Sequence, residues 1–126
     1  MSDTVKMKHI LWIPGTKGDL MDMPEDIRKD FGYGLYQAQR GEYPDIAKPL
    51  KGFGGASVLE LVEDHESGTF RAVYTVKFED AIVVLHVFQK KSKRGKETPQ
   101  QDIDLIHERL KWAKVIHQDW KKKKGK

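Results

Sequence analysis

The clearest pattern of apolar and polar positions lies in the second half of the chain. Between Thr69 and Phe78, apolar residues occupy every second position, which predicts a β-strand with one face toward a core. Residues Ile82–Phe88 are almost continuously apolar, as expected for a strand that is covered on both faces. Glu79 and Asp80 supply a turn between the two segments. The two strands are therefore expected to pair antiparallel.

Two further strands are indicated nearer the N-terminus. The segment His9–Ile13 is apolar and short, and Pro14 with Gly15 ends it. The segment Val58–Glu63 precedes polar turn residues and has the length of an ordinary strand.

Two helices are indicated by apolar residues at spacings of three and four. The first is expected to begin near Pro24, and its apolar side consists of Ile27, Phe31, Leu35 and Ala38. Gly32 and Gly34 leave open a break into two shorter helices. The second helix is expected to follow Thr98 and Pro99, with Thr98 as its cap. Its apolar stripe consists of Ile103, Ile106, Leu110 and Ala113.

This order of elements predicts an α+β fold with the sequence β-α(α)-β-β-β-α. The strands should form a twisted, mainly antiparallel sheet that packs against the helices. A chain of 126 residues is long enough for one core and too short for two. We therefore expect a single domain over residues 1–120, followed by a basic C-terminal tail at residues 121–126.

The composition argues against several classes of protein. No apolar run approaches the ~20 residues that cross a bilayer, and residues 1–8 lack the apolar segment of a signal peptide. The chain has no cysteine, which excludes disulfides and thiolate zinc sites. The expected protein is cytoplasmic, makes no contact with a membrane, and uses neither a cofactor nor a metal.

The charges are distributed unevenly along the chain. Residues 1–86 carry 10 Lys and Arg against 14 Asp and Glu, a net charge of −4. Residues 87–126 carry 13 against 5, a net charge of +8. Five cations fall between Lys90 and Lys96, directly behind a predicted strand. Such a separation predicts a basic face that binds phosphates or an acidic partner.

An ordered set of short motifs runs through most of the chain. The motifs are Met23-Pro24, Gln37 to Gly41, Lys48 to Lys51, Glu60-Leu61, Phe70-Arg71 to Tyr74, and Leu85 to Lys91 with Thr98-Pro99. Together they resemble the RelE/HigB toxins of the RelE/ParE superfamily. The resemblance is greatest to the branch of phage-derived HigB-like proteins, and it covers roughly residues 8–115.

The resemblance implies a small RelE-like domain that acts as the toxin of a type II toxin–antitoxin pair. The toxins that this chain resembles are ribosome-dependent, metal-independent endoribonucleases that cut mRNA. In their reaction the 2′-hydroxyl attacks the adjacent phosphate, and Arg and Lys residues on the sheet support the reaction. The implied partners are a cognate antitoxin, often a helix-turn-helix protein, together with mRNA and the ribosome.

The resemblance and the charge pattern together nominate basic site residues. Arg71 is predicted to contact the scissile phosphate from the strand face opposite Tyr74, pointing away from the core. Lys90 and Lys91 are predicted to offset the negative charge that develops in the transition state. Antiparallel pairing should bring them near the start of the strand that carries Arg71. The predicted RNA-binding residues are Lys48, Lys51, Lys93, Arg94 and Lys96.

Candidates for proton transfer are Glu60 and His86. Each has a structural alternative, because Glu60 can be an ion-pair partner of Arg71 and His86 can be a hydrogen-bonded core residue. Some relatives also use a tyrosine or histidine near the C-terminus, for which His107 and Trp112 are the replacements in this chain.

One departure from the family pattern concerns Val62, which stands where an arginine usually follows Glu-Leu. The sheet has therefore lost one cation. A non-catalytic homologue that binds RNA or the ribosome remains an alternative function. A ParE-like inhibitor of DNA gyrase, which has the same fold, is another.

Overall fold

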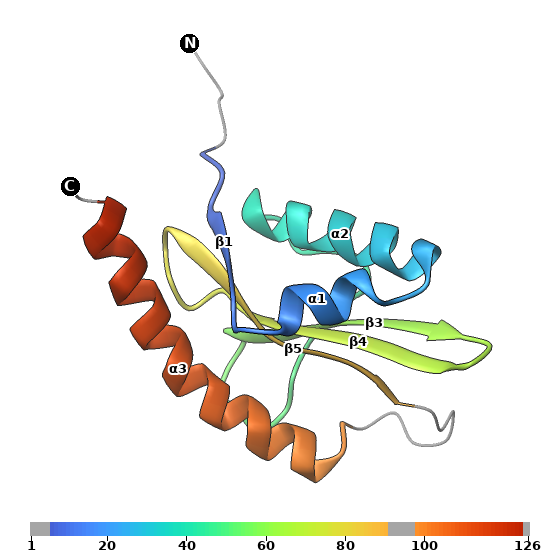
Figure 1. Cartoon of the computed structure of the whole chain (residues 1–126). Helices are drawn as coiled ribbons and strands as arrows, with labels where there is room; N and C mark the ends of the chain where they lie inside the picture. Colours follow the sequence, from blue (N-terminus) through green and yellow to red (C-terminus); the bar gives the residue numbers. More distant parts are fainter. Residues whose placement is uncertain (1–5, 91–97, 125–126) are drawn as a thin grey trace.

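A computed structural model describes residues 6–90 and 98–124 of the chain. Within them, five strands form one sheet in the order β1-β5-β4-β3-β2. Figure 1 shows α1 and α2 on one side of this sheet and α3 on the other. The strands are β1 (His9–Trp12), β2 (Ala47–Pro49), β3 (Val58–His65), β4 (Gly68–Thr75) and β5 (Ala81–Lys90). The helices are α1 (Thr16–Met21), α2 (Glu25–Gln39) and α3 (Gln100–Lys124).

The centre of the sheet is an antiparallel meander of β3, β4 and β5. On one side β1 pairs parallel with β5, and on the other side β2 pairs antiparallel with β3. The predicted α+β class and the mainly antiparallel sheet are confirmed. In the described part of the chain, none of the helices has both the length and the apolar character needed to cross a membrane.

Both faces of the sheet are covered, and each contributes to a separate core. One core lies under α1 and α2 and includes Phe31, Phe70 and Tyr74. The other lies under α3 and includes Leu85 and Ile106. Every residue of β4 is buried as a result. The alternation seen along this strand therefore separates two cores and does not separate core from solvent.

A close approach of helix and sheet explains why a glycine stands in the middle of α2. A Cβ built on Gly34 would lie 3.1 Å from Leu61 Cδ1 on β3. A larger residue would therefore require the Leu61 side chain to shift by a few tenths of an ångström. The helix continues through this point without a break, so the alternative of two shorter helices within it is wrong.

Two short elements were not predicted, and three predicted strand ends shift by two residues or more. Helix α1 and strand β2 have only 6 and 3 residues, too few to show a period. Strand β4 ends at Thr75 and not at Phe78. Strand β3 continues to His65. Strand β5 continues to Lys90.

Helix α3 includes most of the segment that was predicted to be a basic tail. It continues through Lys124, so four of the lysines at its end are helical. Its last turns are held by His117, whose Nε2 lies 2.6 Å from Asp80 Oδ1 and whose ring stacks on Phe78 at 4.1 Å. Lys121 Nζ also lies 3.6 Å from Asp80 Oδ2. Helix α3 therefore extends past the boundary that was predicted at residue 121.

Candidate functional site

A pocket of about 600 Å³ opens between β2, the turn that follows it, and the beginning of α3. Its lining contains two lysines, a buried carboxylate, a hydroxyl, an amide and an imidazole. These polar residues are Lys48, Lys51, Glu60, Thr98, Gln100 and His107. The lining combines cations with groups that transfer protons or donate hydrogen bonds. Such a set is suited to an anionic ligand.

A buried polar cluster forms the base of this pocket. Arg71 Nη1 donates to Glu60 Oε1 at 3.0 Å and to Thr98 Oγ1 at 3.1 Å. Thr98 Oγ1 in turn donates to Glu60 Oε2 at 3.0 Å. Arg71 and Glu60 are each only 2% exposed. The cluster ties β3, β4 and the start of α3 together, and both oxygens of Glu60 are engaged.

The sheet register places these residues side by side. On β2 and β3, Lys48 stands directly opposite Glu60, and the Lys48 Nζ lies 3.6 Å from Glu60 Oε1. Two residues further along β3, Val62 stands opposite Arg71. Because side chains alternate between faces, Lys48, Glu60 and Arg71 all lie on the face that α3 covers.

His107 reaches the pocket from α3. Its ring stacks on that of Phe53 with 4.0 Å between the ring centroids, and its side chain is exposed. The stacking restricts the orientation of the imidazole without using either ring nitrogen. Both nitrogens therefore stay accessible for proton transfer. From the sequence, His107 was expected only as a replacement for a C-terminal tyrosine or histidine. Gln100 was not predicted to be a site residue.

His86 lies under α3 in a hydrogen-bonded setting. Its Nε2 lies 2.8 Å from Asp102 Oδ1, and Arg109 Nη1 lies 3.3 Å from its Nδ1. Since the guanidinium can only donate, Nδ1 accepts and Nε2 carries the proton. Burial lowers the pKa of His86, and the neighbouring Asp102 only partly opposes that shift. Of the two interpretations of His86, this geometry fits the hydrogen-bonded structural residue.

The structure corrects the predicted orientation of Arg71. The side chain lies on the strand face opposite Tyr74, as expected, but α3 covers that face. Arg71 is therefore buried, and the expectation that it points away from the core is wrong. The structural alternative for Glu60, an ion pair with Arg71, is present. Tyr74 packs in the core on the other side and is fully buried.

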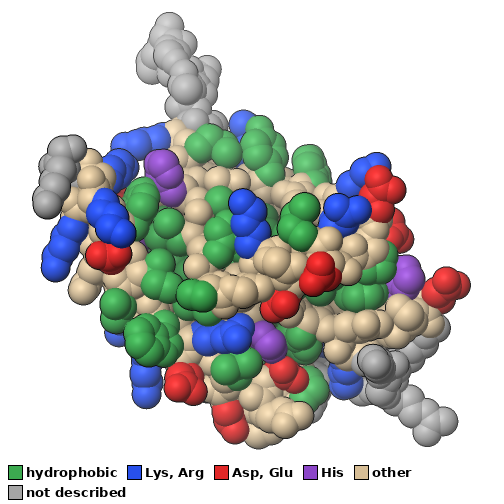
Figure 2. All heavy atoms as spheres, in the orientation of Figure 1, with side chains coloured by type: hydrophobic (Ala, Val, Ile, Leu, Met, Phe, Trp, Pro, Cys, Tyr) green, Lys and Arg blue, Asp and Glu red, His purple; other side chains and the backbone are tan. Residues whose placement is uncertain are grey.

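The remaining basic residues are only partly placed. Lys90 ends β5 and stands opposite Thr69 on β4, so the expected proximity of the two strand ends is confirmed. The predicted residues Lys91, Lys93, Arg94 and Lys96 lie outside the described residues. Figure 2 shows Lys and Arg side chains interspersed with acidic and apolar ones over this view of the molecule, without one continuous basic face.

Comparisons with known proteins place the chain among relatives. The family model described as "Phage derived protein Gp49-like (DUF891)" matches residues 18–111. Among solved structures, the chain is similar to the crystal structure of the toxin-antitoxin complex RelBE2 from Mycobacterium tuberculosis. That similarity has 17% sequence identity and a TM-score of 0.46, and it covers 72% of this chain and 100% of the other. No curated protein matches the sequence.

Proposed function

Because the chain belongs to the family of phage-derived Gp49-like proteins, we propose that it is the toxin of a toxin–antitoxin pair. The proposed reaction is metal-independent cleavage of mRNA on the ribosome. The motifs that resemble the HigB-like branch of the RelE toxins lie largely within the matched residues 18–111. The finer assignment to that branch, and the nuclease activity itself, are parts of this proposal.

The observation that carries the proposal is the pocket at the start of α3. It brings two lysines and an exposed histidine together beside a buried Arg–Glu pair. Cleavage of RNA by its own 2′-hydroxyl needs a base for that hydroxyl and an acid for the leaving 5′-oxygen. It also needs cations where charge develops on the phosphorus oxygens.

We assign roles within this pocket as follows. His107 accepts the proton of the 2′-hydroxyl or donates one to the leaving oxygen, since its ring nitrogens are accessible. Lys48 and Lys51 stabilise the phosphorane, because both line the pocket and carry a positive charge. Glu60 holds Lys48 in place at 3.6 Å. Arg71 fixes Glu60 and is therefore a positioning residue that does not touch the phosphate.

The basic residues behind β5 extend the proposed RNA contact along the strand. Lys90 and the residues outside the described part, Lys91, Lys93, Arg94 and Lys96, precede Thr98 in the chain, and Thr98 lines the pocket. In this proposal they neutralise phosphates that flank the scissile one. The proposed partners are mRNA, the ribosome and a cognate antitoxin.

Expression in bacteria tests this function. The protein should arrest growth, and primer extension should detect new 5′ ends within the coding region of an abundant mRNA. A copy of that mRNA without its start codon should stay intact, because a ribosome-dependent enzyme cuts only mRNA that is being translated. Cleavage by purified protein on ribosomes should also give 2′,3′-cyclic phosphate ends. Intact mRNA during growth arrest would contradict the nuclease proposal.

One observation favours a second candidate function. Arg71 is buried and its Nη1 donates to Glu60 and Thr98, and the residue opposite it on β3 is the apolar Val62. The described sheet residues therefore present no guanidinium to a phosphate at this position. A protein that binds RNA or the ribosome without cleaving it would need only the lysines. Ribosome binding without any new 5′ ends would select this alternative.

A further inference from the structure

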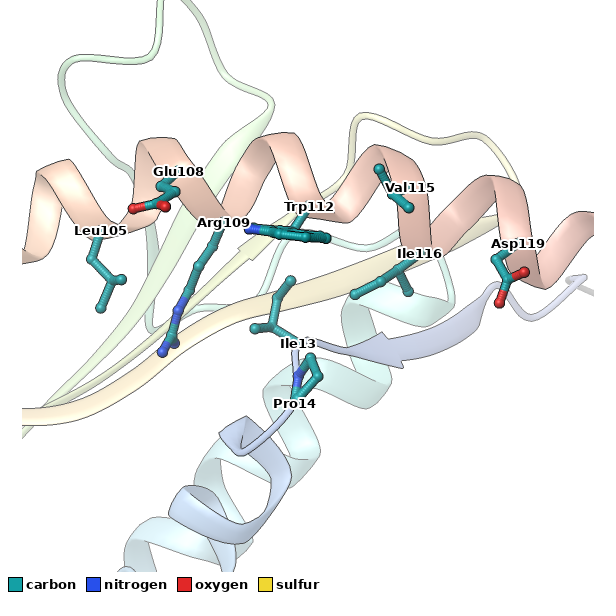
Figure 3. Close-up of a pocket in the computed structure, with 9 residues that line it drawn as sticks. All are labelled: Ile13, Pro14, Leu105, Glu108, Arg109, Trp112, Val115, Ile116 and Asp119. Carbon is teal, nitrogen blue, oxygen red and sulfur yellow. The ribbon is translucent and has the colours of Figure 1, made fainter.

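A second hollow, of about 580 Å³, lies on the other side of α3. Figure 3 shows it between the helix and the turn that follows β1. Ile13 and Pro14 form one wall, and side chains of α3 form the other wall. Its rim on α3 carries Trp112, 57% exposed, and Val115, 54% exposed. Two large apolar side chains in such a position mark an unfilled contact surface.

The residues along this rim follow a regular spacing. Leu105, Glu108, Trp112, Val115 and Asp119 are separated by steps of three, four, three and four residues. Such a spacing places them in one row along the helix and is the row that packs against a second helix in coiled coils and bundles. We call these five residues the outer stripe of α3. Figure 3 shows Leu105 and Asp119 near its two ends.

The outer stripe faces a different direction from the pocket of the proposed function. With about 100° of rotation per residue, His107 lies about 120° around the helix from the middle of the stripe. Ala113 and Ile106, which are fully buried, face the sheet instead. Helix α3 therefore contributes to two surfaces and a core, and a third hollow, lined by His107, Glu108 and Trp112 among others, lies between the two surfaces.

The charges of the stripe are acidic and are not balanced locally. Glu108 forms no ion pair with the described residues. Asp119 pairs with Lys123 at 3.3 Å, but both are largely exposed, so this pair contributes little. Arg109 also lines the groove, but its guanidinium is engaged, donating to the Leu85 carbonyl at 2.9 Å and to His86 Nδ1 at 3.3 Å. The groove is thus apolar in the middle and carries the carboxylates of Glu108 and Asp119 toward its ends.

We propose that this groove binds an amphipathic helix of a partner protein. The apolar row of that helix packs between Trp112 and Ile13, and its Lys or Arg residues pair with Glu108 and Asp119. These two acids are separated by 11 residues, or about three helical turns. The partner helix therefore carries basic residues at positions i and i+11 beside its apolar row. This inference stands on the groove alone and does not depend on RNA cleavage.

A second copy of this chain does not fit the same groove. The outer stripe contains two acids and no cation. If two copies of α3 packed antiparallel through Trp112, each Asp119 would face Leu105 and each Glu108 would face an apolar residue. Shifting the register to align the acids would bring Glu108 against Asp119. Either arrangement buries an uncompensated carboxylate, which opposes association.

The proposal can be tested with two designed helical peptides, each constrained by a side-chain lactam. Both have leucines at a heptad spacing, and one has arginines at two positions 11 residues apart where the other has glutamates. Fluorescence anisotropy with the full-length protein should show binding of the arginine peptide at least about tenfold tighter than the glutamate peptide. Trp112→Ala should weaken binding of the arginine peptide by at least about tenfold. The matched control Tyr33→Ala removes an aromatic ring that is 63% exposed on α2 and should change nothing.

A charge exchange makes the test specific. The double variant Glu108→Lys/Asp119→Lys should reverse the preference, so that the glutamate peptide binds more tightly. Equal affinity of the two peptides for the wild type, or no binding of either at about millimolar concentration, would overturn the proposal. Sedimentation velocity provides a second measurement. A concentration-dependent dimer that Trp112→Ala abolishes would identify the occupant as a second copy and would also overturn it.

Discussion

Arg71 and Glu60 lie on neighbouring strands with 3.0 Å between Nη1 and Oε1, and each is 2% exposed. Removing one partner of a charged pair this deeply buried strongly destabilises the folded protein, since the other charge then remains unpaired in the interior. Thr98 bonds to both residues and connects the pair to the start of α3. The pair is therefore a structural connection between sheet and helix, as well as the base of the proposed site.

The first prediction concerns this pair. Arg71→Ala should lower the free energy of unfolding by about 3–5 kcal/mol, because the Glu60 carboxylate loses its buried counter-charge. The double variant Arg71→Met/Glu60→Leu should recover most of that loss, since neither charge remains. Urea denaturation measures both values. The control Lys29→Ala, from an exposed pair with Glu25, should change stability by less than about 1 kcal/mol. If the Arg71→Ala protein were as stable as the wild type, Arg71 would not be balancing a buried charge on Glu60.

The second prediction concerns Tyr74, whose hydroxyl has no hydrogen-bond partner among the described residues. Burial raises the pKa of this phenol above its ordinary value, so the hydroxyl stays protonated. Tyr74→Phe removes an unsatisfied polar atom and leaves the ring in place. Stability should rise by about 1 kcal/mol. A lower midpoint of urea unfolding for Tyr74→Phe would show that the hydroxyl is satisfied.

The third prediction concerns Glu63 on β3. Burial, together with a hydrogen bond and repulsion from Asp30, raises the pKa of Glu63 to about 7. Its ordinary pKa is 4.5, so between pH 4.5 and about 7 the folded protein binds more protons than the unfolded chain. The contribution of this residue to stability is therefore full at low pH and is lost as the pH rises through that window.

Glu63→Gln removes this titration. Thermal melting should show that the variant gains stability relative to the wild type from pH 5 to pH 8. The matched control is Glu66→Gln, at an exposed position in the neighbouring turn. Its difference in stability from the wild type should be the same at pH 5 and at pH 8. A difference for Glu63→Gln that is independent of pH would contradict the raised pKa.

The meander and the two longer helices were predictable from the sequence because their periods extend over many residues. The apolar run of β5 and the alternation along β4 predicted their antiparallel pairing, and the structure adds the register, with Thr69 opposite Lys90. The short elements α1 and β2 were not predictable, because 6 and 3 residues show no period. Strand β2 matters for the site, since it places Lys48 opposite Glu60.

The burial of Arg71 could not be read from the sequence for a related reason. A single arginine in an alternating strand has the pattern of a solvent-facing residue. Only the position of α3, which depends on contacts between distant parts of the chain, decides that this face is covered. The same applies to His107, whose stacking on Phe53 joins residues 54 positions apart. The types of residue at the site were predictable, but their arrangement was not.

The fourth prediction concerns RNA binding. The variant Lys48→Ala/Lys51→Ala should bind a short single-stranded RNA more weakly, and its affinity should depend less on salt. Each phosphate contact contributes about −0.7 to the slope of log K against log salt, so losing two should flatten the slope by about 1.4. Anisotropy between about 50 and 200 mM salt measures it. Lys17→Ala/Lys29→Ala removes two exposed lysines elsewhere and should keep the wild-type slope. An unchanged slope for the pocket variant would place the RNA elsewhere.

The most direct test of the central claim is the rate at which purified protein cleaves mRNA bound to programmed ribosomes. We expect cleavage by the wild type and by Lys17→Ala/Lys29→Ala, in the presence of enough EDTA to remove traces of transition metals. We expect a rate at least about a hundredfold lower for His107→Ala and for Lys48→Ala/Lys51→Ala, with unchanged thermal melting. A single 2′-deoxy nucleotide at the cleaved position should block the wild-type reaction. Cleavage by both pocket variants at the wild-type rate, or no cleavage by the wild type, would contradict the central claim.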